Sequence, residues 1–366
     1  MPMKGRRVLK RIQIMSNAEN KKINIFDLDE KALCHFVKEE LGAPAFRGKQ
    51  IFGWMYGSAR DFSDMTNLPK DLREKLAQVA TWGGLQMITK QESRKDGTRK
   101  YLFGLSDGNS IESVFMKYKY GNSICISSQA GCRMGCKFCA STLAGLSRNL
   151  TPGEIIQQIV MAQQDTGEKI NHVVVMGTGE PFDNYENLSA FLRLIAEKDG
   201  LNIGMRNITV STCGIVPRIL EFAKDFPQVN LAISLHAASD SERSKTMPIN
   251  HRYGLQELMA ACREYIKLTN RRITFEYALI QGVNDGKQDA AQLSDLLSGM
   301  LCHVNLIPLN KVRETGLSGS SRKHGEEFKE LLAMRGINAT VRRELGSDID
   351  AACGQLRLKN SDNQKN

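Results

Sequence analysis

Three cysteines, Cys132, Cys136 and Cys139, lie within eight residues in the segment Cys-Arg-Met-Gly-Cys-Lys-Phe-Cys. Thiolates are soft ligands that suit zinc or iron–sulfur clusters. A structural zinc site usually takes four protein ligands, and the next cysteine along the chain is Cys213. Three thiolates on a four-iron cube leave one iron open to a substrate or cofactor. The spacing therefore favours a [4Fe-4S] cluster, with an incomplete zinc site and three buried free thiols as the alternatives.

The chain contains nine cysteines in all, and their pattern does not suggest a disulfide framework. Their number is odd, the chain is long at 366 residues, and the basic N-terminus lacks the apolar stretch of a secretion signal. We therefore expect a reducing, cytoplasmic location. Taken alone, each of the outlying Cys125 and Cys353 would be expected to be a small core residue.

Polar residues also follow several of the expected strands. The segment Met176-Gly-Thr-Gly-Glu-Pro181 follows one strand, and Ser211, Ser234-Leu235-His236 and Asn310 lie at the ends of others. Any one of them could be an ordinary capping group in a loop. Their shared position suggests ligand contacts, because chemistry in parallel α/β folds takes place at the carboxyl ends of the strands.

The elements that must position these residues alternate between strand and helix from about residue 125 to 345. Expected strands cover 123–127, 172–176, 206–211, 230–236, 272–279, 303–308 and 339–343. Expected helices cover 151–164, 184–197, 216–224, 254–267, 285–298 and 325–335. Six such units predict an α/β fold with a parallel sheet and right-handed crossovers, forming a partial (βα)6 TIM-like barrel.

Two different segments precede the barrel. Apolar residues at helical spacing predict helices over 31–41, 46–56 and 68–79, whereas the turn pairs Asp96-Gly97 and Asp107-Gly108 predict β-hairpins. The expected organisation is a basic disordered tail (1–22), a small helical accessory domain (23–84), a β-hairpin linker (85–117), the core barrel (118–348) and a C-terminal segment with a polar tail (349–366). Basic residues of the accessory domain could bind RNA phosphates or simply form a solvated helix face.

The charge is concentrated near the N-terminus. The chain carries a formal charge of +10, and its first 22 residues contain seven Lys or Arg and one Glu. A polyanionic partner such as RNA fits this pattern, as does a basic tail without any partner. No apolar run approaches the roughly 18 residues of a membrane helix, so we expect no membrane association.

The three-cysteine loop after the first barrel strand resembles that of the radical S-adenosylmethionine (SAM) superfamily, and Gly179-Glu180 resembles its SAM-binding motif. Together with Cys125 and Cys353, the pattern closely resembles the RlmN/Cfr family of RNA methyltransferases within that superfamily. The segments that carry the resemblance are 125–129, 131–139, 176–181, 234–236, 247–250, 305–308 and 348–356.

The resemblance implies a role for each of these residues. Cys132, Cys136 and Cys139 would bind one [4Fe-4S] cluster, and two molecules of SAM would be used per turnover. Cys353 would be methylated, Cys125 would resolve a protein–RNA crosslink as a disulfide, and Glu112 would accept a proton, although a single Glu in a strand is usually a surface residue. The implied SAM ligands are Gly179, Glu180, Ser211, Ser234, Leu235, His236 and Asn310.

The implied reaction is methylation of carbon 2 of an adenine in 23S rRNA, at the peptidyl transferase centre, and of an adenine beside the anticodon in tRNAs. The base must leave its stack to react. The other implied partner is an electron donor such as flavodoxin or ferredoxin, and we expect a monomer. The alternatives are a Cfr-type enzyme acting on carbon 8 of the same rRNA adenine, a radical SAM enzyme acting on a small molecule, and a non-catalytic iron–sulfur protein that binds RNA. The segment Gly179–Asn184 resembles the branch of the family that acts on carbon 2 more than the Cfr-type branch.

Overall fold

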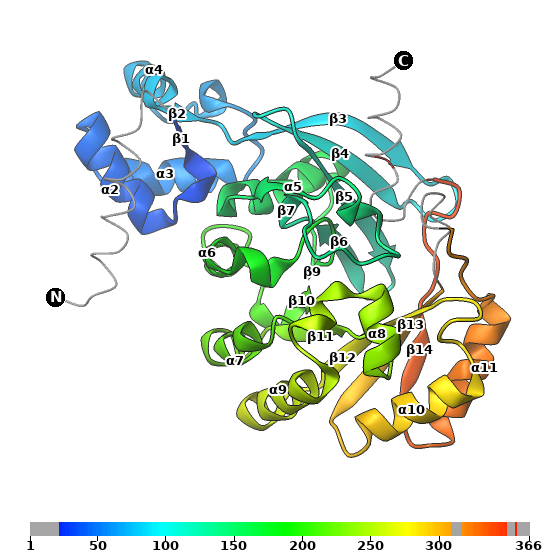
Figure 1. The fold of residues 1–366 in the computed structure, drawn as a ribbon. Helices are drawn as coiled ribbons and strands as arrows, with labels where there is room; N and C mark the ends of the chain where they lie inside the picture. The colour runs from blue at the N-terminus through cyan, green and yellow to red at the C-terminus, as the bar shows by residue number, and fades with distance from the viewer. Residues whose placement is uncertain (1–21, 309–315, 350–355, 357–366) are drawn as a thin grey trace. The chain divides into compact units, whose positions relative to one another are not determined.

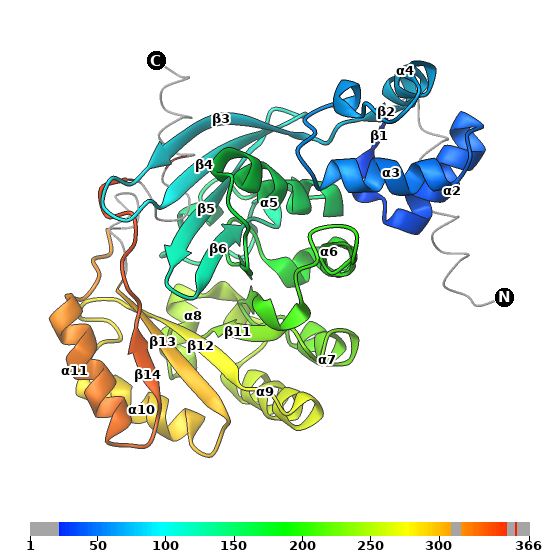
Figure 2. The same cartoon turned by 180° about the vertical axis from the view of Figure 1, so that it is seen from behind.

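The computed structural model describes residues 22–308, 316–349 and 356. The chain divides into two compact units, which are described separately. Figures 1 and 2 trace the elements of both from opposite sides. Asn310, Cys353, residues 1–21 of the expected basic tail and the polar C-terminal end lie outside the described residues.

The first unit consists of the described residues up to Gln86 together with 150–168 and 189–204. Its elements are β1 (Ile23–Asn24), α2 (Glu30–Leu41), α3 (Phe46–Met55), α4 (Lys70–Val79), β2 (Ala80–Thr81), α5 (Pro152–Thr166) and most of α6 (Tyr185–Ile195). The three helices predicted before residue 80 are therefore present. This unit also takes in α5 and most of α6, which the sequence pattern predicts as helices of the barrel.

Local signals in the sequence explain where these helices begin. The Asp29 side chain accepts a hydrogen bond from the backbone N–H of Ala32 and caps α2. Thr151 and Glu154 form a reciprocal capping box at the start of α5, as the sequence predicted. Gly48 lets α3 approach α2 closely, because a Cβ there would lie 2.5 Å from the Cα of Cys34.

The second unit contains an open ten-stranded sheet with the order β14-β13-β12-β11-β10-β9-β6-β5-β4-β3 (Figure 1). Its strands are β3 (Leu85–Glu92), β4 (Arg99–Leu105), β5 (Ser110–Tyr118), β6 (Gly121–Ile126), β9 (His172–Val175), β10 (Ile208–Thr212), β11 (Asn230–Ser234), β12 (Ile273–Leu279), β13 (Cys302–Pro308) and β14 (Ala339–Val341). From β6 to β14 every pairing is parallel, whereas β4–β5 and β5–β6 are antiparallel. This is the predicted partial α/β barrel preceded by β-hairpins.

The helices of this unit follow the parallel strands in turn. They are α7 (Val216–Asp225), α8 (Asp240–Thr246), α9 (Leu255–Thr269), α10 (Lys287–Leu297) and α11 (Arg322–Ala333). In both views α7 lies beside α9 and α10 beside α11 (Figures 1 and 2). The apolar strands are covered by helices, which is the environment in which parallel sheets occur.

Two elements of this unit are missing from the sequence prediction. A short antiparallel hairpin pairs β7 (Gln129–Gly131) with β8 (Leu146–Asn149), and α8 follows β11. The Ser239 side chain accepts a hydrogen bond from the N–H of Glu242 at the start of α8. The sequence Ser-Asp-Ser-Glu is a capping pattern that could have identified this helix.

We predict that Gly48→Ala lowers the free energy of unfolding by about 1–3 kcal/mol, because the added methyl group forces α3 away from the α2 backbone. Gly53→Ala is the matched control, since Gly53 lies in the same helix with no atom near its absent Cβ, and its replacement should be neutral or stabilising by up to about 1 kcal/mol. Equal effects of the two substitutions in urea unfolding would contradict this account.

Candidate active site

The loop with the three cysteines joins β7 to β8 and is held at both ends by backbone contacts. The N–H of Cys132 donates to the carbonyl of Gly145 at 2.9 Å. Gly131 has a positive φ of 81°, and a Cβ there would lie 2.0 Å from the same carbonyl oxygen. The two ends of the loop are therefore in direct backbone contact, which only glycine allows at position 131.

Hydrogen bonds within the loop fix the second and third cysteines. The N–H of Cys139 donates to the carbonyl of Cys136 at 3.1 Å, and the Thr142 hydroxyl reaches both of their carbonyls. The N–H of Lys137 donates to the carbonyl of Thr246, the last residue of α8. The loop is therefore ordered by its own contacts and by α8.

The thiols lie in mostly apolar surroundings. Cys136 packs in a buried cluster with Cys213 and Met247, flanked by Met134, Phe138, Cys139, Ile215 and Ile249. Burial raises the pKa of Cys132 to about 12 and also raises the pKa of Cys136. A metal that takes the place of the proton would hold these sulfurs as thiolates.

The donor set fits an iron–sulfur cube. Within the described residues, no group of three or more His, Cys, Asp or Glu side chains is arranged to hold a metal ion. The ligands of a cube bind three different irons and need not converge on a single point. Cys132, Cys136 and Cys139 supply three thiols from one ordered loop, which is the ligand chemistry that such a cluster takes.

The loop that follows β9 lies against the end of β6 through backbone contacts. The N–H groups of Ser128 and Gln129 both donate to the carbonyl of Thr178, at 2.9 and 3.1 Å. A Cβ on Gly177 would lie 2.8 Å from the carbonyl of Ile126, and one on Gly179 would lie 2.7 Å from the Cβ of Gln129. Both glycines are therefore required by this close approach.

Glu180 ends this loop with a buried side chain that faces backbone donors. Its carboxylate accepts hydrogen bonds from the N–H of Phe182 at 3.0 Å and from the N–H of Cys213, just after β10, at 2.8 Å. Burial raises the pKa of Glu180, although these hydrogen bonds oppose the rise. The Glu180 side chain thus joins the ends of β9 and β10.

The predicted SAM ligands on the next strands also come together. The hydroxyl oxygens of Ser211 on β10 and Ser234 on β11 are 3.4 Å apart. Leu235 is fully buried, and the N–H groups of Leu235 and His236 both donate to the carbonyl of Glu276 on β12. The carboxyl ends of three adjacent strands are therefore joined at this point.

His236 has a fixed ring orientation and a defined hydrogen-bonding pattern. Its φ is +56°, its Nδ1 accepts from the N–H of Ala278 at 2.9 Å, and the ring packs edge-to-face with Phe138 of the cysteine loop. Burial, with a smaller effect of Arg243, lowers the pKa of His236 to about 3. The ring is therefore neutral, and its Nε2 carries the proton. A fixed N–H donor thus lies beside the cysteine loop.

Arg243 on α8 is fully buried beneath these strand ends. Its Nη2 donates to the carbonyl of Cys213 at 2.7 Å and also to Ser234, and its Nε donates to the carbonyl of Leu235 at 3.1 Å. Its Nη1 donates to Asn250 Oδ1 at 2.9 Å. The prediction of site residues from the sequence did not include Arg243.

Glu112 is not a surface residue. On β5 it is only 4% exposed, and its carboxylate pairs at 2.9 Å with the ammonium of Lys100, which is fully buried on β4. Its carbonyl accepts from the Ser127 hydroxyl at 2.7 Å. Lys100 was also absent from the predicted site residues, because a lysine in a strand carries no distinctive signal.

Cys125 on β6 lies on the same face of the sheet as Glu112. Cys125 pairs directly with Val114, two residues along β5 from Glu112, and strand side chains alternate between faces. Cys125 packs in a buried cluster whose members are Val114, Met116, Tyr118, Val174, Met176 and Leu345. Leu345 brings the chain that leads to Cys353 against this cluster.

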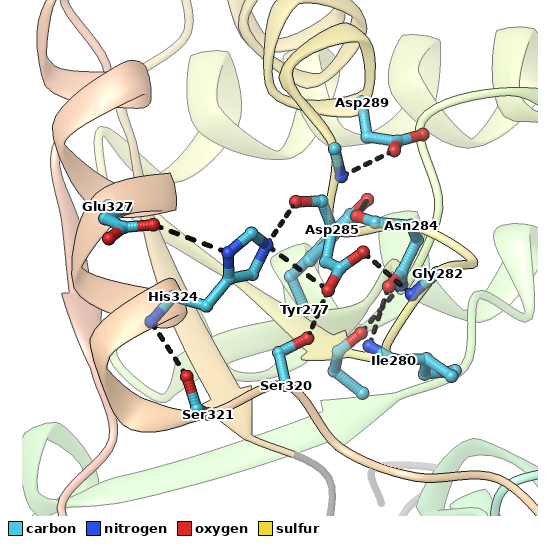
Figure 3. Close-up of polar contacts among 12 residues, drawn as sticks. Tyr277, Ile280, Gly282, Asn284, Asp285, Asp289, Ser320, Ser321, His324 and Glu327 are labelled. Carbon is cyan, nitrogen blue, oxygen red and sulfur yellow. Dashed lines mark hydrogen bonds and ion pairs between the residues drawn. The ribbon is translucent and has the colours of Figure 1, made fainter.

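A second polar cluster joins the loop after β12 to the start of α11 (Figure 3). Asp285 accepts from the Ser320 hydroxyl at 2.6 Å, and His324 Nε2 contacts the carbonyl of Asp285 at 2.8 Å. In a catalytic triad the histidine lies between the serine and the acid, whereas here Asp285 contacts both Ser320 and His324. The cluster is therefore not arranged to activate a nucleophile. The neighbouring Asn284 donates to the carbonyl of His236 at 2.8 Å. This cluster therefore supports the conformation of His236.

Among the described helices, none combines the length and apolar character that crossing a bilayer requires.

We predict that His236 makes stability fall as the medium is acidified. Because its pKa is lowered from 6.5 to about 3 on folding, the unfolded chain binds more protons between these values, and stability rises with pH across that window. The loss between pH 6.5 and 5 should be about 2 kcal/mol. Urea unfolding at several pH values measures it. His236→Gln should remove this slope, whereas His251→Gln, at an exposed position, should keep it.

The comparisons with known proteins agree with this geometry. The model of the radical SAM superfamily matches residues 126–294, and that of the ribosomal RNA large subunit methyltransferase N-terminal domain matches residues 23–81. A crystal structure of a radical SAM methyltransferase from Sphaerobacter thermophilus superposes with a TM-score of 0.88 at 45% identity, covering 91% of this chain and 98% of that one.

Curated relatives are similar over nearly their whole length. A probable dual-specificity RNA methyltransferase RlmN of Clostridium beijerinckii is 53% identical, covering 91% of this chain and 94% of the relative. A protein of the same name from Clostridioides difficile is 52% identical, covering 93% and 99%. With this identity, with both family models matched, and with the cysteine loop at the strand ends of a partial α/β barrel, the chain belongs to the RlmN family of the radical SAM superfamily.

Proposed function

We propose that this protein methylates carbon 2 of an adenine in 23S rRNA and of an adenine beside the anticodon in tRNAs. The observation that carries the proposal is the convergence of the cysteine loop, Glu180, Ser211, Ser234 and His236 at the carboxyl ends of adjacent strands. The names of the relatives supply the RNA substrate class. Family membership implies a [4Fe-4S] cluster and SAM as the cofactors.

Different residues at the strand ends would bind the cluster and the parts of SAM. Cys132, Cys136 and Cys139 would hold the cluster, which when bound supplies the electron that cleaves SAM to a 5′-deoxyadenosyl radical. The loop at Gly179 and Glu180 would hold the methionine amino group, because backbone carbonyls and a carboxylate accept from an ammonium. Two hydroxyls and one N–H are available to the rest of SAM, and they come from Ser211, Ser234 and His236 Nε2.

The steps that transfer the methyl group and release the RNA are assigned to Cys353, Glu112 on β5 and Cys125 on β6. In this proposal the Cys353 thiolate would accept a methyl group from a first SAM, leaving S-adenosylhomocysteine. That methyl group would then lose a hydrogen atom to the 5′-deoxyadenosyl radical derived from a second SAM, and the resulting carbon radical would add to the adenine.

The adduct would return its unpaired electron to the cluster and its ring proton to Glu112. The Cys125 thiolate would then attack the sulfur of Cys353, forming a disulfide while the bond from that sulfur to the transferred carbon breaks, and protonation of this carbon would complete the methyl group and release the RNA. Glu112 on β5 and Cys125 on the paired strand β6 lie on the same face of the sheet, which supports the last two roles.

Contacts near the C-terminus support the role of Cys353. The side chain of Asp348, five residues before Cys353, accepts hydrogen bonds from the Ser93 hydroxyl at 2.6 Å and from the N–H of Arg94 at 2.9 Å. The N–H of Gly346 donates to Asp96 at 2.9 Å. The chain that leads to Cys353 is therefore anchored on the turn between β3 and β4, in the same unit as Cys125.

The product identifies the reaction. Anaerobically reconstituted protein with methyl-labelled SAM should convert an adenine in a 23S rRNA fragment to 2-methyladenosine, measured by mass spectrometry of the nucleosides. Cys353→Ala should form no product while keeping the iron and sulfide content. A product of 8-methyladenosine would favour the Cfr-type alternative, and normal product from Cys353→Ala would contradict the covalent route.

Two substitutions on the hairpin side should trap the RNA on the protein. Cys125→Ala blocks disulfide formation, and Glu112→Gln removes the proton acceptor, so each should slow turnover by about a hundredfold or more and accumulate an RNase-sensitive crosslinked species on gels. Glu92→Gln is the control, because Glu92 also pairs with a strand cation, Arg99, but is half exposed. The role of either residue would be refuted if its variant showed no crosslink and normal turnover.

A further inference from the structure

Arg243 is a buried cation whose hydrogen-bond partners are all neutral. Its four hydrogen bonds reach the backbone carbonyls of Cys213, Ser234 and Leu235 and the side-chain oxygen of Asn250. In the part of the chain that the structure describes, no carboxylate forms an ion pair with it. Burying an ammonium or guanidinium without a counter-ion costs several kcal/mol even after relaxation. The charge of Arg243 therefore requires a separate explanation.

The two acidic residues of α8 have other partners. The Glu242 carboxylate pairs with the ammonium of Lys245 at 2.7 Å. The Asp240 carboxylate, on the same helix, accepts from the side chain of Asn250 at 2.8 Å and from the N–H of Leu255 at 2.9 Å. It thereby caps the start of α9 and does not pair with the guanidinium. Among the described residues, no carboxylate lies within ion-pair distance of the guanidinium, and the negative charge of Asp240 acts on it only from a longer distance.

The cysteine loop lies next to this cation. Arg243 donates to the carbonyl of Cys213, and the Cys213 side chain packs with Cys136. The last residue of α8, Thr246, accepts from the N–H of Lys137 within the loop. One short helix therefore both supports the loop and carries the charge.

We propose that Arg243 is the internal counter-ion of the iron–sulfur centre, a positioning residue that sets how readily the centre accepts an electron. The inference rests on the ligand role proposed for Cys136. A cube held by three thiolates is anionic, and reduction adds another negative charge. A cation fixed in low-dielectric surroundings stabilises the reduced form more than the oxidised form and so raises the reduction potential.

A purely structural role would need hydrogen bonds but not charge. An amide side chain can also donate to strand-end carbonyls, and a lysine keeps the charge while losing the planar fork of donors. The two roles are therefore separated by Arg243→Gln, which removes the charge, and Arg243→Lys, which retains it. Arg271→Gln is the matched control. This half-buried arginine precedes the amino end of β12 and donates to the side chain of Asn230.

The experiment is an anaerobic redox titration of the full-length, cluster-loaded protein, followed by electron paramagnetic resonance. The midpoint potential should become more negative in Arg243→Gln and stay near the wild-type value in Arg243→Lys and Arg271→Gln. The rise in Tm that accompanies cluster loading should also be smaller in Arg243→Gln than in the wild type, because the cluster no longer neutralises a buried cation.

An unchanged potential in Arg243→Gln, at wild-type iron and sulfide content, would overturn the inference and leave only a structural role. If Arg243→Gln does not fold, Arg243→Lys decides, because a counter-ion role requires its potential to match the wild type and a clear shift overturns it. Wild-type protein that binds no cluster would instead refute the proposed function.

Discussion

The close backbone contact between the end of β6 and the loop after β9 is the constraint on which the site depends. Gly177 and Gly179 allow the two chains to meet without side chains between them, and Thr178 is held by two N–H donors. This contact fixes the direction in which Glu180 leaves the loop. Because Glu180 in turn accepts from the N–H of Cys213, the ends of β6, β9 and β10 form one rigid edge.

The polar side chains along this edge of the sheet are either buried in their neutral form or hydrogen-bonded to neutral partners. His236 is neutral because it is buried, and its ring nitrogen has a partner in the backbone of Ala278. Glu180 is surrounded by backbone donors, and Arg243 by backbone carbonyls. The strand-end backbone therefore supplies most of the polar contacts, which is why few charged residues are needed to build the site.

The sequence predicted most of the architecture because its local signals agree with the tertiary fold. The capping box at Thr151 and the alternation of apolar strands and helices gave the elements nearly at their observed bounds. The three thiols and the Gly-Glu loop could be recognised because their spacing is specific. Ser211, Ser234 and His236 were placed together only through their position at strand ends.

The parts that could not be predicted depend on long-range contacts. Lys100 and Glu112 pair across β4 and β5, and nothing in either strand indicates that both side chains are buried. Arg243 lies on α8, a helix of seven residues whose only local signal is its Ser239 cap. The grouping of α5 with the N-terminal helices likewise follows from packing that no local pattern encodes.

The anchoring of the chain at Asp348 has a consequence for rate. Five residues separate Asp348 from Cys353, and a fully extended chain of that length spans at most about 18 Å. Because Asp348 is held by Ser93 and Arg94, the covalent length of the chain sets an upper limit to the distance between the Cys353 thiol and these residues, so this stretch acts as a tether. In the proposed reaction the encounter of the Cys353 thiol with the methyl donor is therefore a first-order process at a high effective concentration, and lengthening the tether would dilute the nucleophile without altering its chemistry.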